Sequence, residues 1–337
     1  MAAMHALVNP ASQRIERGVR PFDLGRDLHP VAQLIADAFA DELDSQGEAA
    51  LRELRFMGHM GGLVRLLAGT TGDFQDVFNG FVWIEDGKLV GNVTVQRAAS
   101  GSGRWQIANV AVDPRYRGRG ISRALMETAL EYIEGMGGAW AVLQVRAQNE
   151  IARKLYDSLR FETMGGKIEM RSPRPPKVNA HPVLPGLAPF SADDSTLLYD
   201  LVNSEQSAES QWWRAARRAD FDIPLEQVIS EWFSRLVGRD RIYRMALRDF
   251  TGRFESALIL TARRWKGEHS LQLWVRPDAQ ERYERRMILW ALSALQDYPV
   301  WPVSMTLNTA HTGAQTILEE LGFQEVTTLL TLRRKIG

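Results

Sequence analysis

Two blocks of this sequence recur at nearly the same spacing, and this repetition constrains the fold more than any other feature. A strand-like run precedes Pro114 and a helical stretch follows it, and the same pattern surrounds Pro277, 163 positions later. A second block repeats at a spacing of 162, where Ala152, Leu159 and Phe161 recur as Ala314, Leu321 and Phe323. A strand, a proline and a helix in this order are common by themselves, but the agreement of two separate blocks indicates an internal duplication.

A proline-rich segment lies between the two copies. Residues 171–189 contain six of the fourteen prolines of the chain. Prolines at this density remove backbone donors and favour extended conformations, so neither a helix nor a central strand is expected to cross the segment. The sequence therefore predicts a flexible tail over 1–13, a first domain over 14–172, a linker over 173–189 and a second domain over 190–337.

Composition excludes several classes of protein. The 337 residues include 41 basic and 41 acidic side chains, and this zero net charge gives no reason to expect a nucleic-acid or membrane partner. The absence of cysteine excludes disulfides and thiolate chemistry, and the six histidines lack metal-ligand spacing, so no metal is expected. No apolar run reaches the roughly 18 residues that span a bilayer, and no signal peptide is evident. We therefore expect a cytoplasmic protein.

Each copy is expected to begin with helices and to continue into strands. The spacing of apolar residues predicts helices over Asp27–Phe39 and Arg52–Leu67. Two β-rich runs around Asp86-Gly87 predict a hairpin over Phe81–Gln96. The order of these elements favours an α/β class with a mixed sheet and one helical crossover near its middle.

The stretch from Val110 to Leu125 contains the chemistry that is easiest to interpret, because a strand leads through a basic glycine loop directly into a helix. Gly118 and Gly120 allow a sharp turn and a close approach of the backbone to an anion. The first turn of a helix has free N–H groups and a positive dipole end, which suit a pyrophosphate. Guanidinium groups around the turn add phosphate donors, and they belong to Arg115, Arg117 and Arg119. The loop predicts a phosphorylated ligand.

The spacing excludes two common phosphate loops. A P-loop requires a lysine after its second glycine, and a dinucleotide fingerprint requires a third glycine, and neither follows Gly120. The remaining pattern, Arg115-x-x-Gly118-x-Gly120 after a V-x-V-x-P strand, resembles the acetyl-CoA signature of the GCN5-related N-acetyltransferase (GNAT) superfamily. A second block, Asn149 to Phe161, resembles the N-x-x-A-x-x-x-Y-x-x-x-x-F pattern of that family at the same distance downstream. The joint resemblance covers about Ile107 to Phe161.

This resemblance implies two tandem domains of mixed, mostly antiparallel sheet with flanking helices. In the first domain, strand Ile107–Val112 would separate from its parallel neighbour Ala141–Arg146. Acetyl-CoA would lie against the separated strand and the start of the next helix, with Asn149 at the pantetheine arm and Arg153 near the nucleotide end. The residues assigned to acetyl-CoA in this way are Val110, Val112, Arg115, Arg117, Gly118, Arg119, Gly120, Ile121, Ser122, Asn149 and Arg153.

Tyr156 falls where the family places its general acid. The implied mechanism is direct attack of an amine on the acetyl thioester, with Val112 N–H holding the thioester oxygen. A coenzyme A thiol has a pKa near about 8.5 and a tyrosine near about 10, so protonation of the thiolate by Tyr156 would be uphill by about 2 kcal/mol. A core residue on a helix face is the alternative interpretation of Tyr156.

The sequence departs from the family pattern at the general base. Histone-acetylating members have a glutamate in the central strand, whereas this chain has Gln106, so the acceptor amine would lose its proton through water or another carboxylate. Ser122 replaces a more usual glycine or alanine, and its hydroxyl could add a phosphate bond. An acidic group follows the first predicted helix, where it could attract a cationic amine or form a solvated face: Asp37, Asp41, Glu42 and Asp44.

The second copy lacks the residues that the resemblance assigns to acetyl-CoA binding and catalysis in the first copy. At a spacing of 163, the two loop glycines become Glu281 and Tyr283 and Arg115 becomes Asp278, and at 162 Tyr156 becomes Leu318. We therefore expect a GNAT-like domain without acetyl-CoA binding, which packs against the first domain and walls the acceptor pocket. Its tryptophans are expected to fill a core or an interface. They are Trp212, Trp213, Trp232, Trp265, Trp274, Trp290 and Trp301.

Taken together, the resemblance implies an acetyl-CoA-dependent N-acetyltransferase acting on a small-molecule or peptide amine, with a homodimer compatible with the sequence. The alternative is a non-catalytic acyl-CoA-binding sensor, which the missing strand glutamate permits. A third interpretation treats the loop around Arg117 as an RNA contact, and the neutral net charge argues against it.

Overall fold

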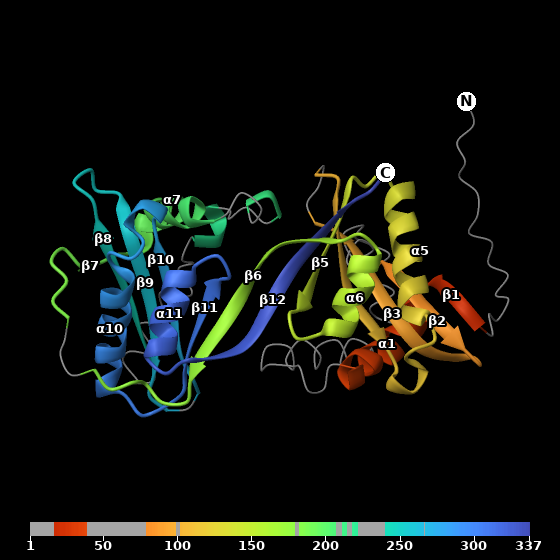
Figure 1. Ribbon diagram of the computed structural model, residues 1–337, viewed down its shortest axis with the longest axis horizontal. Helices are drawn as coiled ribbons and strands as arrows, with labels where there is room; N and C mark the ends of the chain where they lie inside the picture. The colour runs from red at the N-terminus through yellow and green to blue at the C-terminus, as the bar shows by residue number, and fades with distance from the viewer. Residues whose placement is uncertain are drawn as a thin grey trace. The chain divides into compact units, whose positions relative to one another are not determined.

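The computed structural model describes residues 17–38, 79–98, 102–178, 182–206, 211–213, 218–221, 240–265 and 267–337. The chain divides into two compact units (Figure 1). The first contains Met1–Gln144, Leu155–Glu162 and Arg333–Gly337, and the second contains Val145–Lys154 and Thr163–Leu332. The predicted helix over 52–67 and the tail over 1–13 lie outside the described residues. No helix of the described part is long and apolar enough to cross a membrane.

The first unit is built around a five-stranded sheet with the strand order β1-β2-β3-β4-β5. Neighbouring strands of this sheet are antiparallel, except for β4 and β5, which are parallel. The elements are β1 (Arg17–Pro21), α1 (Leu24–Ala38), β2 (Gly80–Glu85), β3 (Lys88–Arg97), β4 (Arg104–Val112), α5 (Ile121–Gly135), β5 (Trp140–Arg146) and α6 (Glu150–Ser158). The mixed sheet with one crossover helix, α5, confirms the predicted class.

The predicted hairpin is formed by β2 and β3. Asp86 and Gly87 connect the strands with φ values of 49° and 73°, and Glu85 pairs with Lys88 across the turn. A two-residue turn with two positive φ angles matches the twist of the flanking strands, which is why Asp-Gly predicts it.

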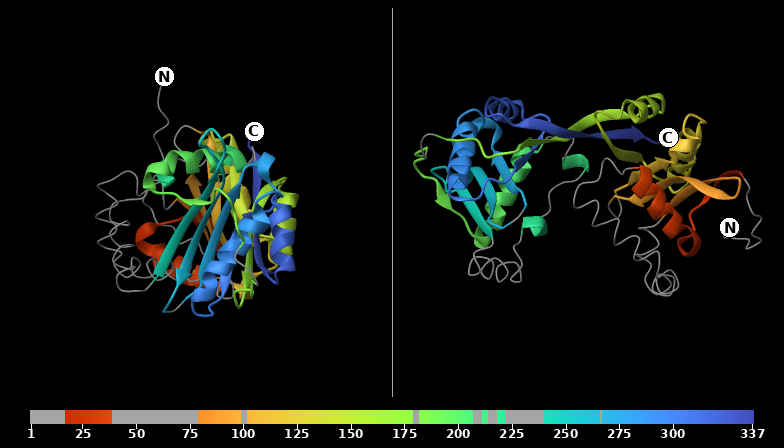
Figure 2. Two further views of the ribbon diagram at one scale, coloured as in Figure 1. Left: turned by 90° about the vertical axis from the view of Figure 1, so that its left-hand side faces the viewer. Right: turned by 90° about the horizontal axis from the view of Figure 1, so that it is seen from below.

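Helices α1 and α5 cover opposite faces of this sheet (Figures 1 and 2). On α1, Val31 and Ile35 pack with Val82 and Ile84 of β2. The ring of Phe81, whose side chain points to the other face of the same strand, lies 5.5 Å from that of Tyr132 on α5. Both faces of the sheet are therefore buried.

The start of α1 differs from the prediction. The helix begins at Leu24, three residues before Asp27, because the Asp23 side chain caps it by accepting a hydrogen bond from the Arg26 amide at 3.0 Å. Asp27 lies inside the helix and is buried, where Arg20 donates to it at 2.5 and 2.7 Å. Asp27 thus belongs to a buried ion pair, which the periodicity of apolar residues does not reveal.

The second unit repeats the plan of the first. Strands β8, β9 and β10 are antiparallel, β10 and β11 are parallel, and α10 connects them as α5 connects β4 and β5. Its elements are β6 (Glu162–Ser172), β7 (Ala188–Pro189), α7 (Ser195–Glu205), β8 (Asp240–Arg248), β9 (Phe254–Arg263), β10 (His269–Val275), α10 (Glu284–Ala294), β11 (Val303–Asn308), α11 (Thr312–Glu320) and β12 (Gln324–Lys335). The tandem organisation predicted from the repeat is confirmed.

Strand β6 follows the first copy in sequence but belongs to the second unit. It pairs antiparallel with β11, from Ser172 opposite Val303 to Lys167 opposite Asn308. The C-terminal residues Arg333–Gly337 conversely belong to the first unit. Of the predicted linker over 173–189, the described residues 173–178 and 182–187 form neither helix nor strand, whereas Ala188–Pro189 form the edge strand β7, which pairs with β8.

Aliphatic side chains predominate in the core of the second unit, and of its described tryptophans Trp274 and Trp290 are partly buried and pack against that core. Leu258, Leu271, Ile288 and Leu292 are buried at the interface of the sheet with α10. Of the tryptophans that the structure describes in this unit, none is fully buried and Trp265 is 68% exposed. Branched aliphatic side chains fill the narrow space between helix and sheet, and the large indoles lie at its margin. Trp232 lies outside the described residues.

Candidate active site

The loop between β4 and α5 has the conformation that an anion site requires. Gly118 and Gly120 have φ values of 76° and 79°, and a Cβ at either position would meet no atom within 4 Å. Glycine is therefore required here by the left-handed backbone and not by lack of space. Gly120 caps α5 without a side-chain hydrogen bond, and Ala124 is the first residue whose amide bonds back, to the Gly120 carbonyl at 3.1 Å. The amides of Ile121 and Ser122 are left for a ligand.

Arg115 lies beside this loop but is already paired. Its guanidinium donates to both carboxylate oxygens of Asp113, at 3.1 and 2.7 Å, and its side chain is 82% exposed. The hydrogen bond from Arg115 lowers the pKa of the Asp113 carboxyl below its ordinary value. Asp113 therefore orients the Arg115 side chain. To contact a phosphate, Arg115 would have to release Asp113 or bind both groups at once.

Arg117 and Arg119 are also held by local contacts. Arg117 Nε donates to the Val112 carbonyl at 3.2 Å. The guanidinium of Arg119 lies 5.0 Å from the ring centre of Tyr116. The structure thus gives each of the three predicted phosphate donors a partner within the loop or the strand that precedes it, and their contact with a phosphate remains a prediction.

Strand β4 carries a β-bulge shortly before the loop. Its pairing with β3 shifts between Asn92 and Thr94, where β4 contributes one residue more than its neighbour. Asn109 lies in the bulge with a φ of 51°, and its carbonyl accepts a hydrogen bond from Asn92 Nδ2 at 2.9 Å. Asn109 was not expected as a site residue, and its only sequence signal is that asparagine tolerates the left-handed conformation.

The bulge determines which main-chain groups face β5. Before it, the Gly103 carbonyl accepts a hydrogen bond from β5, whereas after it the Asp113 amide donates to β3. Because main-chain groups alternate along a strand, the extra residue turns those of Val110 and Val112 toward β5. An unbulged strand would direct them toward β3.

Pairing between β4 and β5 ends early, as the predicted separation of the central strands requires. The last partners are Gln106 and Val142, although β4 continues to Val112 and β5 to Arg146. This confirms the splayed parallel pair. The main-chain groups of Val110 and Val112 therefore face a region where no strand pairs with β4 on that side.

We expect Asn109→Val to lower the free energy of unfolding by about 1–2 kcal/mol, because a β-branched residue is disfavoured in the left-handed conformation. Asn109→Gly is the matched control, since both variants lose the side-chain bond to Thr94 but only valine is strained. Urea unfolding measures both. Equal losses in the two variants would contradict a role for the backbone conformation.

Tyr156 lies on α6 in the same unit as the loop. Its side chain is buried, and its ring lies 5.9 Å from that of Phe161. Burial raises the pKa of the Tyr156 hydroxyl to about 12, so it stays protonated at neutral pH. Arg123, in the first turn of α5, donates to Ser158 at the end of α6 at 2.6 Å and ties this helix to the start of α5.

Asn149 and Arg153 lie in the segment that belongs to the second unit. Asn149 caps α6, its Oδ1 accepting a hydrogen bond from the Ala152 amide at 3.1 Å. Arg153 Nη1 donates to the Ala147 carbonyl at 3.1 Å. The structure thus assigns both side chains a local role, and their contact with acetyl-CoA remains a prediction.

Gln106 is confirmed as a residue of the central strand, between Gln96 on β3 and Val142 on β5. Of the acidic group after the first helix, the structure describes only Asp37, whose charge contributes, after that of Asp113, to raising the pKa of Arg115. Asp41, Glu42 and Asp44 lie outside the described residues.

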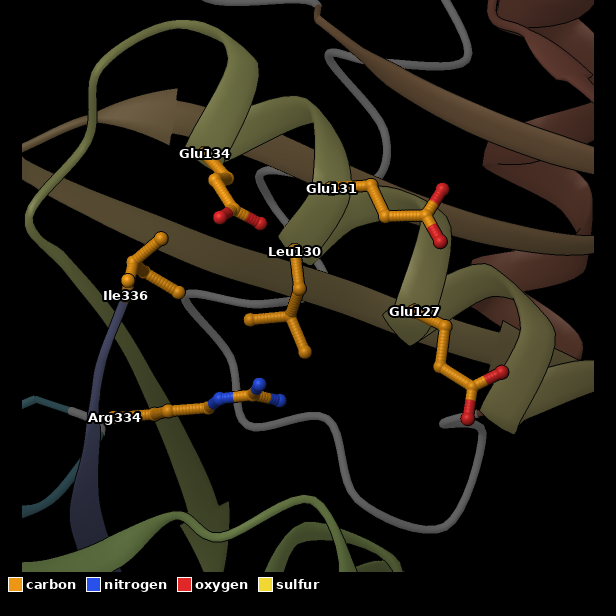
Figure 3. Close-up of a pocket in the computed structure, with 7 residues that line it drawn as sticks. Glu127, Leu130, Glu131, Glu134, Arg334 and Ile336 are labelled. Atoms are coloured by element: carbon orange, nitrogen blue, oxygen red, sulfur yellow. The ribbon is translucent and has the colours of Figure 1, made fainter.

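A pocket of about 170 Å³ on the first unit contains none of the predicted site residues. Glu127, Glu131 and Glu134 of α5 line it together with Leu130 and Arg334. Figure 3 shows the carboxylates of Glu127 and Glu131 turned away from the Arg334 guanidinium. The three glutamates are exposed, so this is a solvated, charged helix face.

In the second unit, the equivalent loop is occupied by protein groups. Glu281 keeps the left-handed turn with a φ of 65°. Tyr283, which precedes α10, donates to Glu255 at 2.9 Å, and Leu318 is fully buried. A hydrophobic residue at the position of Tyr156 leaves no proton donor there.

A buried charged cluster in this unit was not predicted from the sequence. His311 lies between two carboxylates, with Nε2 2.8 Å from Glu284 and Nδ1 3.1 Å from Glu205. Burial opposes the charge of His311, but hydrogen bonds to the two glutamates outweigh it and raise its pKa to about 9. We call these three residues the His311 cluster.

We expect the folded protein to lose stability as the pH rises from about 7 to about 10. A histidine with a raised folded pKa contributes fully below its unfolded value of 6.5 and loses this contribution as the pH passes about 9, up to about 3 kcal/mol in total. Urea unfolding at the two pH values measures the effect. His311→Gln should remove the difference, and a wild-type protein equally stable at both would contradict a charged His311.

Residues 59–161 match the family model described as the acetyltransferase (GNAT) family. A mycothiol acetyltransferase from Brachybacterium faecium is 31% identical over 145 residues, which are 40% of this chain and 43% of that protein. The ribosomal protein bS18-alanine N-acetyltransferase of Escherichia coli is 47% identical over 53 residues, 16% of this chain and 36% of that protein. The chain thus spans less than half the length of these curated relatives.

Two solved structures share the fold over almost the whole chain. A GCN5-related N-acetyltransferase from Sphaerobacter thermophilus has a TM-score of 0.60 at 16% identity and covers 96% of both chains. A tandem GNAT protein from the clavulanic acid biosynthesis pathway has a TM-score of 0.56 at 15% identity, covering 96% of this chain and 99% of the other. At such identities the similarity concerns the fold alone.

Proposed function

Because this chain belongs to the GNAT superfamily and has the fold of its tandem members, we propose that it is an acetyl-CoA-dependent N-acetyltransferase whose first unit carries the activity. One observation supports this most strongly. Strand β4 is bulged and separated from β5, and it leads into two left-handed glycines and an uncapped helix start. This combination provides main-chain donors along one continuous path.

The chemistry of these donors fits the two ends of acetyl-CoA. The amides of Ile121 and Ser122, at the positive end of the α5 dipole, suit the diphosphate. The main-chain groups of Val110, turned toward β5 by the bulge, suit the amides of the pantetheine arm, which would bond to them as a neighbouring strand does. The Val112 carbonyl already accepts a hydrogen bond from Arg117. The paired Arg115 would supply charge at the outer side of the diphosphate.

In the proposed reaction, the acceptor nitrogen attacks the thioester carbonyl carbon, the C–N bond forms and the C–S bond breaks. The Val112 N–H would stabilise the negative charge that develops on the carbonyl oxygen. The sulfur leaves as a thiolate and takes the proton of the Tyr156 hydroxyl. The amine loses one proton to water, since Gln106 cannot accept it, and the Tyr156 phenolate regains a proton from water, which restores the enzyme.

Burial changes the energetics of the proton transfer from Tyr156. With its pKa at about 12, protonation of a thiolate whose pKa is near about 8.5 is uphill by about 5 kcal/mol, against about 2 for an ordinary tyrosine. The cost of proton transfer calculated from the unperturbed pKa values is therefore too low. Tyr156 can act only if the transfer accompanies C–S cleavage, so that the thiolate never accumulates.

Gln106 and the weak acidity of Tyr156 favour the second candidate, a sensor that binds acyl-CoA without turnover. Release of free coenzyme A in the presence of amines distinguishes the two functions, because only the transferase produces it. We propose that the acceptor is a primary amine of a small molecule or a peptide. The cytoplasmic location and the homodimer remain predictions from the sequence.

The test is a coenzyme A release assay across small amines, amino acids, aminoglycosides and peptides. A thiol reagent reports the product without background, because the chain contains no cysteine. Release above the rate of hydrolysis with at least one amine supports the transferase. Tight binding of acetyl-CoA without release across the panel would support the sensor, and absence of binding would contradict both.

A further inference from the structure

The second unit contains a pocket of about 270 Å³ where its two parallel strands separate. Pairing between β10 and β11 ends at Leu271 and Met305, although both strands continue. Residues of β10, β11, α7 and β6 line the pocket. They include Glu205, Gln206, Trp274, Asn308 and Lys167.

One carboxyl group is among the groups that line this pocket. Glu205, at the end of α7, lines it and has a side chain only 12% exposed. Glu205 belongs to the His311 cluster, which places two carboxyl groups against one imidazole. Burial raises the pKa of Glu205, which means that a nearby cation would relieve the cost of its charge.

Two further features favour a ligand that donates hydrogen bonds. Among the described residues, the side-chain oxygen of Gln206 is buried and has no hydrogen-bond partner, an arrangement that costs about 1–3 kcal/mol unless a donor arrives. Trp274 also lines the pocket, and the face of an indole attracts organic cations. Among the described residues that line the pocket, Lys167 is the only basic one, and it is exposed, so water screens its charge.

The repeat explains why this pocket would not take the ligand of the first unit. Glu284, buried at the first position of α10, lies 163 positions after Ile121. His311 lies 162 positions after Asn149. A buried carboxylate thus replaces the Ile121 side chain at the first position of the helix, and its charge would repel a diphosphate bound at that turn. The pocket between β10 and β11 is small, and Glu205 and Gln206 are among the residues that line it.

We propose that this pocket binds a small organic cation, an alkylammonium or guanidinium compound, between the Glu205 carboxylate and the Trp274 indole, with the Gln206 side-chain oxygen as a further acceptor. This is a ligand site of the second unit and does not depend on acyl transfer in the first. Its chemistry is the reverse of that of the glycine loop, since one accepts an anion and the other a cation.

Calorimetric titration of the full-length protein with n-pentylammonium tests the proposal, with 1-pentanol and pentanoate as neutral and anionic probes of the same length. We expect the ammonium compound to bind at least about tenfold more tightly than either control. Equal binding of the three probes, or preference for pentanoate, would overturn the assignment.

Glu205→Gln should weaken binding of n-pentylammonium at least about tenfold, because the amide keeps the shape and removes the charge. Glu131→Gln is the matched control, an equivalent change on an exposed face of α5, and should leave binding unchanged. Unchanged binding in Glu205→Gln would place the amine elsewhere, including at an acceptor site of the first unit, and would overturn the proposal.

Glu205 also contacts His311, so its substitution could unfold the protein. Gln206→Leu avoids this, since the side-chain oxygen of Gln206 makes no hydrogen bond with the part of the chain that the structure describes. We expect this variant to remain folded by circular dichroism and to bind n-pentylammonium at least about threefold more weakly. A folded Gln206→Leu protein with wild-type affinity, together with a Glu205→Gln protein that does not fold, would count against the site.

Discussion

Gly120→Glu should abolish the binding of acetyl-CoA, with an increase in Kd of at least about 100-fold, equivalent to about 3 kcal/mol. The new carboxylate would stand at the start of α5, where it can accept hydrogen bonds from the amides of the first turn. It would therefore occupy the donors that we assign to the diphosphate and add charge repulsion. In the second unit a buried carboxylate, that of Glu284, stands at the first position of α10, one residue after the counterpart of Gly120, and contacts His311.

Strain alone could weaken binding, because Gly120 has a φ of 79° and any side chain costs about 1–2 kcal/mol there. Gly120→Gln has the same strain and nearly the same shape but no charge, so it isolates the electrostatic part. Calorimetry with coenzyme A should give an affinity at least about tenfold higher for the glutamine variant than for the glutamate variant. A folded Gly120→Glu protein that binds coenzyme A like the wild type would contradict the assigned site.

Local sequence signals predicted the parts of this site that depend on few residues. Asp86-Gly87 predicts the hairpin turn because its two positive φ angles need these residue types. Gly118 and Gly120 predict the loop for the same reason, and the alternation of side chains locates β4. The internal repeat predicts the tandem topology, because each copy must form the same sheet to bury its helices.

Features that depend on distant residues could not be predicted in this way. The bulge at Asn109 reverses the main-chain alternation of β4, and no local pattern before it announces the extra residue. The His311 cluster joins three elements that lie far apart in sequence, α7, α10 and the start of α11. The pairing of β6 with β11 depends on which strand completes the sheet, a choice that two similar copies leave open.

Tyr156→Phe should reduce kcat by about 100-fold or more while the Kd of acetyl-CoA stays nearly constant, since loss of a general acid typically costs a factor of about 10² to 10⁴. The hydroxyl is the only group removed, and the ring can keep its contact with Phe161. Because the pKa of Tyr156 is raised to about 12, its hydroxyl remains protonated across the usual assay range. The pH profile of kcat should therefore show no alkaline limb from this residue below about pH 11.

Tyr132→Phe provides the matched control for this deletion of a hydroxyl. Tyr132 lies on α5 in the same unit, with its ring 5.5 Å from Phe81 and 5.8 Å from Trp105. It contributes to packing and has no assigned role in the reaction, so its kcat should equal that of the wild type. Single-turnover release of coenzyme A and equilibrium binding, measured in parallel, separate chemistry from affinity. If Tyr156→Phe turned over as fast as Tyr132→Phe, the thiolate would have to take its proton from water, and the burial of Tyr156 would then serve only the packing of α6.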